Sequence, residues 1–323
     1  MRAVQVTRLD GPSAVEIVDL PTPDRGSRKL LVDVKAAGMA FPDTLLTRGL
    51  YQIKPALPFV PGAEVAGLVA SAPEGGEFRV GDRVAAFPGF GGYAEHVAVD
   101  PAFVFPLPER LSFEAGAALP MNYLTCHFAL VTRGGIQPGE SVLVHGAAGG
   151  IGTAALQLAK AYGARTYAVV SDPSKADVAR VAGADEVVAA EGFRESVAEL
   201  TRGRGVDIIV DPVGGNRFTD SLRCLATLGR LLVIGFTGGS IPEVKVNRLL
   251  LNNISVVGVG WGAYWMGAGG AAYVRQQWDD LLPLMESGAI DPPIGALVPL
   301  AEVAGALDDL ENRRATGKIV LRP

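Results

Sequence analysis

The sequence predicts an α/β protein in two parts, a barrel-like β domain followed by a doubly wound parallel sheet. Three observations support this prediction. Residues 1–120 contain short strand-like runs separated by Gly and Pro turns, which is typical of a barrel. From residue 121 onward, apolar strands alternate with helical segments, as in a sheet with crossover helices. A glycine-rich turn at 146–152 stands between the first of these strands and its helix.

The composition is that of a globular protein with an acidic charge balance. The chain has 323 residues, of which 49% are hydrophobic and 20% charged, and its formal net charge is -5. This length suits two domains, and the charge argues against nucleic acid or a membrane surface as a partner. Cys126 and Cys224 are expected to be buried free thiols in a reducing compartment. With no secretory signal and no apolar run of membrane-spanning length, we expect a cytoplasmic protein.

The β-rich part is predicted from short alternating runs bounded by turn residues such as those at 10–12. The strand-like runs lie at 2–7, 15–19, 30–37, 64–71, 79–85 and 91–99. Residues 112–119 then follow a helical pattern, with Ser112 as N-cap and Glu114 in the first turn.

The second part is predicted from regular alternation of strands and helices. Six strands are expected, at 142–144, 165–170, 186–189, 206–211, 230–235 and 254–259. The first helix follows the glycine turn, and the next three are expected at 174–182, 193–201 and 216–227. Strand 206–211 is almost wholly apolar, as a strand covered on both faces should be. Six strands with crossover helices predict a doubly wound parallel sheet.

The chain leaves this repeat after Trp261. A loop at 267–270 is expected to precede a helix at 271–287. Further strands are expected at 292–299 and 318–321, with a helix between them through residue 312. Because these two strands have no sheet of their own, we expect them to return to the first part. The predicted division is residues 1–121 with 262–323 as one domain, and residues 122–261 as the other.

The stretch 141–160 contains the candidate nucleotide site. A strand, a glycine turn and a helix follow one another, and a helix N-terminus in this setting suits a pyrophosphate. Gly149 lets the backbone approach the phosphates, and Gly152 lets the helix pack closely on the strand. Ala147 stands where the first glycine of G-x-G-x-x-G is usual, so the turn alone is weak evidence. The residues expected to contact the cofactor are Ala148, Gly149, Gly150 and Ile151.

The end of the second strand bears on the choice between NADH and NADPH. NAD-binding folds commonly place an acidic residue there for the ribose hydroxyls, whereas this strand ends in Val170. Ser171 and Lys175 follow, a hydroxyl and a cation that suit a 2′-phosphate, although Lys175 can equally be a solvated lysine on a helix. Asp172 precedes Pro173 and has the pattern of an N-cap. We therefore predict NADPH as the cofactor.

Several motifs occur in a fixed order over nearly the whole chain. They are Ala36-Ala-Gly38 with Asp43, Pro61-Gly-Ala-Glu-Val-Ala-Gly67, Gly81-Asp-Arg-Val84, Gly92-Tyr-Ala-Glu95, the 146–152 turn, Asp211-Pro-Val-Gly-Gly215 and Thr316-Gly-Lys318. With these motifs the chain resembles the zinc-free branch of the medium-chain dehydrogenase/reductase superfamily, the NADPH:quinone oxidoreductase (zeta-crystallin-like) family. The resemblance implies a GroES-like catalytic domain, a Rossmann NADPH-binding domain and a homodimer joined through the last Rossmann strand.

The zinc ligands of other branches of the superfamily are missing. Zinc-dependent relatives carry Cys where this chain has Met39, and His where it has Ala63. Zinc needs at least three converging ligands, and the histidines, His96, His127 and His145, are scattered. We therefore predict no metal. His145, next to the glycine turn, is expected to be packed or hydrogen-bonded.

The nicotinamide half of the cofactor is expected at the carboxyl ends of the first, fourth, fifth and sixth strands. This expectation selects Val213, Gly235, Phe236 and Val259. The resemblance adds two residues at matching positions, Thr125 and Lys318. Thr125 can equally be a helix cap or a core hydroxyl.

Hydride transfer to a quinone or an activated alkene needs orientation and a polar donor for negative charge on oxygen. The family often uses Asn and Tyr at the positions of Ala40 and Leu45, so part of the family's polar site is missing in this chain. Tyr51 is the remaining candidate for substrate contact or oxyanion donor, or else it only packs in its loop. The aromatic residues at 261–265 either form the wall of a site for a planar substrate or anchor an interface.

The sequence therefore predicts an NADPH-dependent, zinc-independent reductase of a small molecule, either a quinone or an activated alkene (an enone or a 2-alkenal). Two alternatives remain open. One is an enoyl-thioester reductase of the enoyl-CoA type, and the other is a non-catalytic NADPH-binding structural protein. The apolar strand 254–259 lies at the predicted sheet edge, which supports a homodimer.

Overall fold

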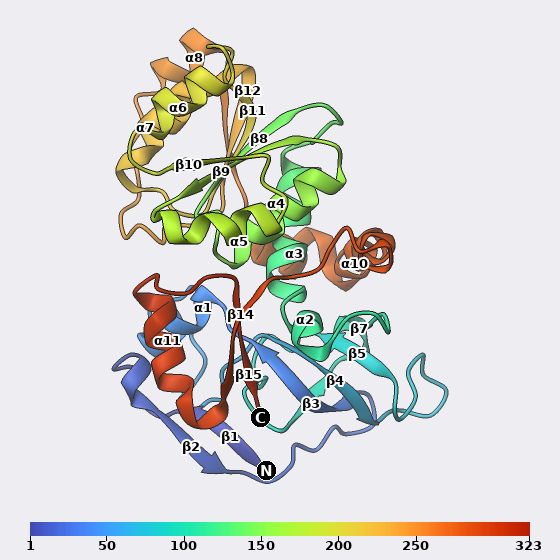
Figure 1. Ribbon diagram of the computed structural model, residues 1–323. Helices are drawn as coiled ribbons and strands as arrows, with labels where there is room; N and C mark the ends of the chain where they lie inside the picture. Colours follow the sequence, from blue (N-terminus) through green and yellow to red (C-terminus); the bar gives the residue numbers. More distant parts are fainter. The chain divides into compact units, whose positions relative to one another are not determined.

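The structure is a computed structural model that describes residues 1–323. The chain divides into two compact units (Figure 1). The first unit comprises Met1–Met121, Gly269–Glu286 and Ile294–Pro323, and the second comprises Asn122–Ala268 and Ser287–Pro293. Residues 262–268 and 287–293 thus belong to the second unit, whereas the sequence prediction places them with the first. None of the helices combines the length and apolar character needed to cross a membrane.

The first unit contains a mostly antiparallel sheet and a separate hairpin. The hairpin pairs β1 (Arg2–Val6) with β2 (Val15–Asp19). The sheet has the order β14-β15-β3-β4-β5-β7, and β6 pairs with β3. Its strands are β3 (Leu30–Gly38), β4 (Glu64–Ser71), β5 (Arg83–Ala86), β6 (His96–Val99), β7 (Val104–Pro106), β14 (Ile294–Pro299) and β15 (Lys318–Arg322). Because β15 pairs antiparallel with β3, the C-terminal strands return to the sheet formed by the start of the chain.

Helices cover and connect these strands. They are α1 (Phe41–Thr47), α2 (Phe113–Ala117), α10 (Gly270–Ser287) and α11 (Val303–Glu311), while α3 (Pro120–His127) leads from the first unit into the second. The predicted cap of α2 is confirmed, since the Ser112 hydroxyl accepts a hydrogen bond from the Ala115 N–H at 3.1 Å. The short helix α1 is absent from the sequence prediction. It begins with Pro42 and Asp43 in its first turn, and the Asp43 carboxylate accepts a hydrogen bond from the Ala40 N–H.

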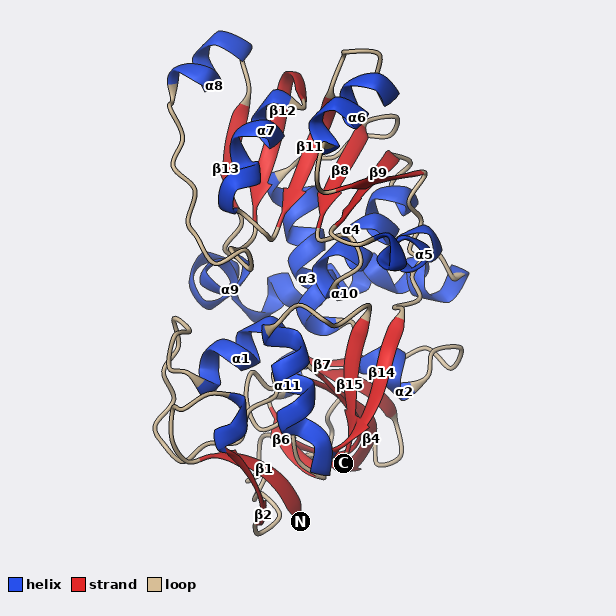
Figure 2. Ribbon diagram, turned by 60° about the vertical axis from the view of Figure 1, so that its left-hand side comes forward, coloured by secondary structure: helices blue, strands red, loops and turns tan.

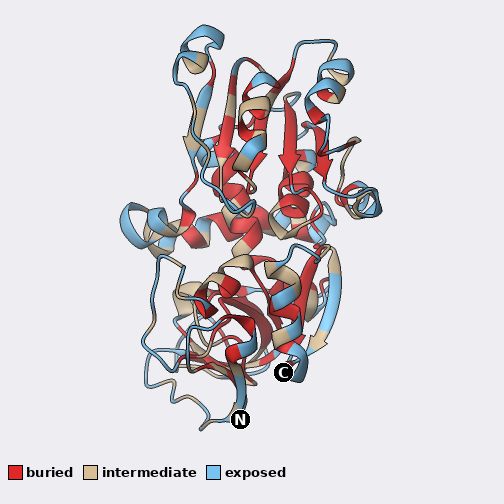
Figure 3. Ribbon diagram, turned by 90° about the vertical axis from the view of Figure 1, so that its left-hand side faces the viewer, coloured by how far each residue is buried: buried red, intermediate tan, exposed pale blue.

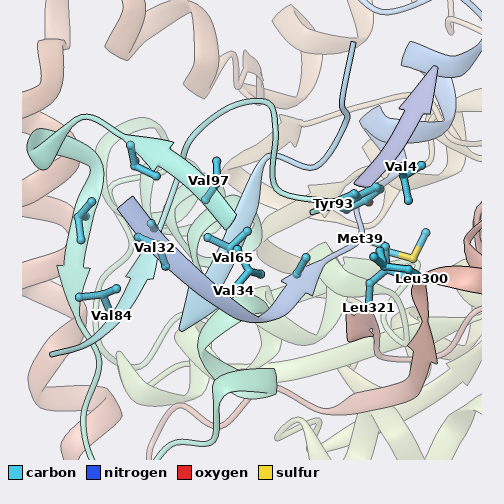
Figure 4. Close-up of a cluster of buried hydrophobic side chains, with 14 of the residues drawn as sticks. Val4, Val32, Val34, Met39, Val65, Val84, Tyr93, Val97, Leu300 and Leu321 are labelled. Carbon is cyan, nitrogen blue, oxygen red and sulfur yellow. The ribbon is translucent and has the colours of Figure 1, made fainter. Parts of the chain in front are cut away.

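A large cluster of apolar side chains from both ends of the chain forms much of the core of the first unit. Valines of the sheet strands are its most frequent members, and they include Val32 and Val65. Leu300 and Leu321 from the C-terminal segment pack into the same cluster, near Met39 (Figure 4). The return of the C-terminal strands thus completes a core that the first part of the chain leaves open.

The second unit is built on six parallel strands, and the predicted doubly wound sheet is confirmed. The order is β10-β9-β8-β11-β12-β13. The strands are β8 (Ser141–His145), β9 (Arg165–Val170), β10 (Glu186–Ala189), β11 (Val206–Asp211), β12 (Leu225–Val233) and β13 (Ser255–Gly258). The bounds of β9, β10 and β11 coincide with the predicted ones. The central strands are buried, and exposure rises on the outer turns of the helices (Figure 3).

The helices of the second unit differ from the prediction at several places, and α8 and α9 have no counterpart in it. They are α4 (Gly150–Ala161), α5 (Ala176–Val181), α6 (Phe193–Leu200), α7 (Phe218–Arg223), α8 (Asn247–Asn252) and α9 (Trp261–Tyr264), with π-helical turns at Phe128–Arg133 and Trp265–Gly269. The helix predicted at 216–227 ends at Arg223, because Leu225 already pairs with Val206 in the sheet. The loop predicted at 267–270 is instead mostly π-helical.

Candidate functional site

The order of the parallel strands defines where a ligand can bind in the second unit. From β8 the chain proceeds toward β10, and from β11 it proceeds in the opposite direction toward β13. In open parallel sheets, ligands bind outside the carboxyl ends of the strands at such a switch point. The strands β13, β12, β11, β8 and β9 lie side by side in this order (Figure 2). The glycine turn follows β8, and the loop 211–215 follows β11, so both lie at the switch point.

Two glycines of the turn, Gly150 and Gly152, have no room for a side chain. A Cβ atom at Gly152 would collide with the Gly146 carbonyl oxygen, and one at Gly150 would collide with the Asn122 amide. Gly149 is the N-cap of α4. The first N–H groups of a helix lack intrahelical acceptors, and with the helix dipole they favour an anion. The expected phosphate-binding residues, 148–151, therefore form the turn and the first residues of α4.

The helix α3 packs on the start of α4. Asn122 lies over Gly150, and the Cys126 thiol donates to the Ile151 carbonyl oxygen with the sulfur and oxygen 3.4 Å apart. Thr125 occupies the interior of α3, so it is not a helix cap. It lies three residues after Asn122 and directly before Cys126, which puts it on the side of α3 that meets α4. Asn122 itself is a neighbour of the glycine turn that the sequence prediction leaves out of the site.

The loops after β11 and β12 are joined to each other. The Thr237 N–H and hydroxyl both donate to the Pro212 carbonyl oxygen at 3.1 Å, and the Gly238 N–H donates to the Val213 carbonyl oxygen at 2.8 Å. A Cβ atom at Gly146 would lie 3.2 Å from a methyl carbon of Val213, so Val213 borders the glycine turn. A Cβ atom at Gly214 would lie 2.9 Å from a ring carbon of Phe236.

The other two predicted residues also lie at this edge. Gly235 stands directly before Phe236, in the loop after β12. The Val259 N–H donates to the Val233 carbonyl oxygen at 2.9 Å, which extends the pairing of β12 and β13. Four of the expected cofactor residues, those at 213, 235, 236 and 259, thus gather at one edge of the sheet.

The loop after β9 presents polar groups at the neighbouring position of the same edge. Ser171 is exposed and Lys175 is half-buried. The Asp172 carboxylate accepts a hydrogen bond from the Ser174 N–H at 2.8 Å, as the predicted N-cap. Hydrogen bonds from Ser174 hold the pKa of Asp172 below its ordinary value. The only carboxylate in this turn is therefore engaged with the backbone.

Two titratable side chains are buried beneath the switch point. The His145 ring nitrogen Nε2 lies 2.8 Å from the Ser221 hydroxyl, which donates to the Arg217 carbonyl oxygen, so Nε2 is the donor. The ring packs edge-on against Phe193, and burial lowers the pKa of His145 to about 4. The prediction that His145 is packed and hydrogen-bonded is confirmed. The Asp211 carboxylate accepts bonds from the N–H groups of the two residues at 213 and 214, each at 2.9 Å.

The first unit contains a buried polar network built from the sequence motifs. One oxygen of Asp43 accepts hydrogen bonds from the Ala40 N–H at 2.8 Å and from the Tyr93 hydroxyl at 2.7 Å. Glu64 and Lys318 form a buried ion pair, and Glu64 also accepts a bond from the Met121 N–H at 2.7 Å. Burial raises the pKa of Asp43 to about 6. Apart from the bond between Ala40 and Asp43, these pairs join residues far apart in sequence, and no local pattern marks them.

Lys318 and Tyr51 both belong to the first unit. Because the Lys318 ammonium is buried and paired with Glu64, we assign it a structural role in place of the expected cofactor contact. Tyr51 is half-buried and packs against a small apolar cluster formed by Val6, Leu46 and Phe59. Burial raises the pKa of Tyr51, so its hydroxyl stays protonated at neutral pH and can donate a hydrogen bond.

The positions of the missing zinc ligands are filled by apolar side chains. Met39 is 1% exposed and Ala63 is 7% exposed. No group of three or more His, Cys, Asp or Glu side chains is arranged to hold a metal ion. Ala40, which stands where the resemblance implies Asn, is buried as well.

Comparison with known proteins identifies the family. Residues 26–109 match the model of the alcohol dehydrogenase GroES-like domain, and residues 150–287 match that of the zinc-binding dehydrogenases. Quinone oxidoreductase-like protein 2 of Bos taurus is 36% identical over 99% of this chain and 92% of its own length. The chain belongs to the quinone oxidoreductase family of the medium-chain dehydrogenase/reductase superfamily. The predicted GroES-like and Rossmann folds are thereby confirmed.

Solved structures of quinone oxidoreductases and related enzymes match the whole fold. A probable oxidoreductase from Mycobacterium abscessus has a TM-score of 0.91 and 46% identity, covering 100% of this chain and 99% of that one. The quinone oxidoreductase from Thermus thermophilus has a TM-score of 0.86 and 36% identity with 100% coverage of both chains, and it was solved also in complex with NADPH. Because the chain belongs to the quinone oxidoreductase family, the protein is an oxidoreductase.

Proposed function

We propose that this protein transfers hydride from NADPH to a quinone without the help of zinc. The main support is the glycine turn at the switch point, closed by Asn122 on one side and Val213 on the other. Gly150 and Gly152 have no room for a side chain, which fits the close packing of a dinucleotide-binding turn. The Thermus thermophilus quinone oxidoreductase, solved in complex with NADPH, supports the same cofactor.

We assign the cofactor contacts by position along the carboxyl edge. The backbone of residues 148–151 binds the pyrophosphate at the start of α4. Ser171 and Lys175 bind the 2′-phosphate, since a hydroxyl and a cation follow the strand there. The nearby Asp172 carboxylate accepts a hydrogen bond from its own backbone. The nicotinamide half is held by the residues at 125, 213, 235, 236 and 259. When bound, NADPH supplies the hydride.

The residues of the first unit provide a donor for the substrate oxygen. Reduction of a quinone to a hydroquinone consumes one hydride and one proton, and negative charge develops on oxygen as the hydride arrives. The Tyr51 hydroxyl stays protonated because burial raises its pKa, and we propose that it donates a hydrogen bond to this oxygen. Water supplies the proton that completes the hydroquinone. An enone or a 2-alkenal develops the same charge on its carbonyl oxygen, so we propose activated alkenes as further substrates.

Zinc independence is proposed from the chemistry of the residues in the ligand positions. A methyl group cannot ligate a metal, and a thioether is a poor ligand for zinc beside thiolate and imidazole. Both Met39 and Ala63 are buried in the apolar core. Metal analysis of the active protein is expected to give less than one zinc per ten chains, and activity should survive dialysis against EDTA. Stoichiometric zinc, or loss of activity that zinc restores, would refute this assignment.

A homodimer is proposed from the edge of the parallel sheet. β13 is the last strand and has a free edge, which invites pairing with another copy. The neighbouring helix α8 carries Leu250 and Leu251, which are 77% and 73% exposed. Sedimentation equilibrium at micromolar concentration should give twice the chain mass of 33.6 kDa.

Cys126 and Cys224 are buried free thiols, which supports the cytoplasm as the location.

The function is tested by following NADPH oxidation against a panel of electron acceptors. Quinones should be reduced, enones and 2-alkenals more slowly, and NADH should give a kcat/KM well below that of NADPH. Fastest turnover with an enoyl-CoA thioester would favour an enoyl-thioester reductase instead. Tight NADPH binding without turnover of any acceptor would favour a non-catalytic protein. An equal or higher kcat/KM with NADH would contradict the assigned roles of Ser171 and Lys175.

A further inference from the structure

The loop that follows α1 and contains Tyr51 displays aliphatic side chains at the surface of the first unit. We define the apolar patch as three residues of this loop and one residue of the turn after β1, namely Leu50, Ile53, Leu57 and Leu9. We propose that the apolar patch binds the flexible hydrocarbon chain of a substituted quinone, so that the enzyme favours quinones with an alkyl or prenyl side chain over the same ring without one. The proposal rests on the quinone reductase function proposed above and adds a subsite for the side chain of the substrate.

The apolar patch exposes large aliphatic side chains in a loop that has few charges. Leu50 is 69% exposed, and the other three members are between 40% and 45% exposed. Residues 49–59 include one charged residue, Lys54, and the Arg48 guanidinium just before them is paired with Glu311. Single exposed apolar residues are ordinary on a protein surface, whereas several of them together mark a contact surface. The loop therefore has the composition of a binding surface for an apolar group.

Leu9 packs against the start of this loop. A Cβ atom at Gly49 would lie 2.7 Å from the Leu9 methyl carbon Cδ1, so Leu9 covers the backbone directly before Leu50. The Leu50 N–H donates to the Leu45 carbonyl oxygen at 2.9 Å, which fixes this part of the loop to the end of α1. Leu9 and Leu50 thus belong to one continuous surface, although they are 41 positions apart in the sequence.

The end of the loop is held beside the same turn. The Val6 N–H donates to the Phe59 carbonyl oxygen at 2.8 Å, and the Phe59 N–H donates to the Val6 carbonyl oxygen at 3.2 Å. Because the two segments are antiparallel, the residues after Val6 lie beside the residues before Phe59. Leu9 and Leu57 therefore stand on neighbouring segments.

A buried cluster supports this surface from beneath. Val6, Leu46 and Phe59 form the cluster, and Tyr51 and Phe90 pack against it. The rings of Phe59 and Phe90 meet edge to face, with centroids 6.2 Å apart and an interplanar angle of 81°. An apolar surface that is already held in place binds a ligand at a small cost in conformational entropy.

A hydrocarbon chain is the occupant that fits the place of the apolar patch. Leu50 directly precedes Tyr51, and Ile53 follows it by two residues. Because the Tyr51 hydroxyl is assigned to a quinone oxygen, a substituent on the same quinone ring is within reach of these aliphatic side chains. Aliphatic side chains offer dispersion contacts and no hydrogen bonds, which matches a chain of methylene groups. The several phosphate charges of a CoA thioester would find only Lys54 in residues 49–59.

The kinetic test uses 1,4-benzoquinones that differ only in an unbranched methyl, butyl or heptyl chain. A methylene group that becomes fully buried improves binding about fourfold, and one that is half covered on an open surface improves it about twofold. We therefore expect the KM of the native enzyme to fall about twofold for each added carbon, while kcat stays the same. A KM that does not depend on the length of the chain would overturn the proposal.

The variants Leu50→Ser and Ile53→Ser test the residues of the apolar patch. Both side chains are exposed, so these replacements leave the buried core unchanged. Each variant should raise the KM for the heptyl quinone about threefold to tenfold and leave the KM values for the methyl quinone and for NADPH unchanged. Leu50→Met keeps an apolar side chain and should retain the native values. The matched control is Val181→Ser in the second unit, where the replaced side chain is 77% exposed and no KM should change.

Three results with these variants would overturn the proposal. An equal rise of the KM for the methyl and heptyl quinones would mean that the loop acts only through Tyr51. Conversion of the dimer to monomers by Leu50→Ser would assign the apolar patch to an interface between copies. Native chain-length dependence in the variant, together with loss of its co-sedimentation with phosphatidylcholine vesicles, would assign the apolar patch to a membrane surface.

Equilibrium dialysis of the complex with NADP⁺ measures binding without turnover. The native protein should bind the heptyl quinone at least tenfold more tightly than the methyl quinone, and Leu50→Ser should reduce this ratio. Equal affinities for the two quinones would overturn the proposal. If the native enzyme reduced no quinone, the proposed function would fail, while the dialysis would still decide whether the apolar patch binds the hydrocarbon chain.

Discussion

The replacement Asp43→Asn gives a quantitative test of the buried network in the first unit. Asp43 is 1% exposed, and one of its oxygens accepts both the Ala40 N–H and the Tyr93 hydroxyl. An Asn side chain can place its single carbonyl oxygen at that position and keep both bonds. The substitution therefore removes the titration of Asp43 while preserving the hydrogen bonds that hold the start of α1.

The sign of the effect follows from the direction of the pKa shift. Burial raises the pKa of Asp43 from 3.8 to about 6, so between these values the folded protein holds a proton that the unfolded chain has released. The contribution of Asp43 to stability is complete below pH 3.8 and is lost as the pH rises through 6. The total amounts to about 3 kcal/mol. About half of it is lost between pH 5 and pH 8.

The measurement is urea unfolding of the native protein and the Asn variant at both pH values. The difference in unfolding free energy between the variant and the native protein should increase by on the order of 1 kcal/mol from pH 5 to pH 8, in favour of the variant. Using this difference cancels the pH dependence that the two proteins share. A difference that stays constant with pH, or moves in the opposite direction, would refute the assignment of a protonatable, buried Asp43.

Three further predictions concern the second unit. Gly152→Ala should weaken NADPH binding at least tenfold and lower Tm, because the new Cβ would collide with the Gly146 carbonyl oxygen. The control is Gly305→Ala, where no atom lies within 4 Å of the new Cβ. If NADPH binds to the Gly152→Ala variant as tightly as to the native protein, the described packing of the turn is wrong. Lys175→Ala should raise the KM for NADPH about tenfold and leave that for NADH unchanged, as steady-state kinetics will show. His145 should stay neutral down to about pH 4, so its contribution to stability is present above 6.5 and lost as the pH falls through 4. A ring that titrates near 6.5 by NMR would refute this.

Local pattern was sufficient for three strands of the parallel sheet. β9, β10 and β11 were predicted with their observed bounds, because short apolar runs between turn residues have one physical solution in a doubly wound sheet. The short helices α1, α8 and α9 were missed. A helix of four to seven residues shows at most two turns of periodicity, and its stability comes from packing that a sequence pattern does not display.

Some features of the candidate site could likewise be predicted from local pattern, and others could not. The glycine turn and the loops after the strands are local features, and parallel topology brings their carboxyl ends to one edge without further information. The bond from Tyr93 to Asp43 joins residues 50 positions apart, and that from Lys318 to Glu64 joins residues 254 positions apart. The second pair depends on how the C-terminal strands return to the first sheet. They become visible only when the fold is known.

Lys318 shows how a sequence can indicate burial and still leave the role open. It begins an apolar strand, and residues 318–321 are all buried, so its ammonium has to be desolvated in any fold that uses this strand in the core. A buried cation requires an anionic partner, which is either a carboxylate of the chain or a phosphate of a ligand. The sequence offers 34 acidic residues and a nucleotide site, and pattern alone does not choose among them. β15 pairs with β3, and β3 pairs with β4, which begins with Glu64. This pairing makes Glu64 the partner of Lys318 and places the lysine in the core of the first unit.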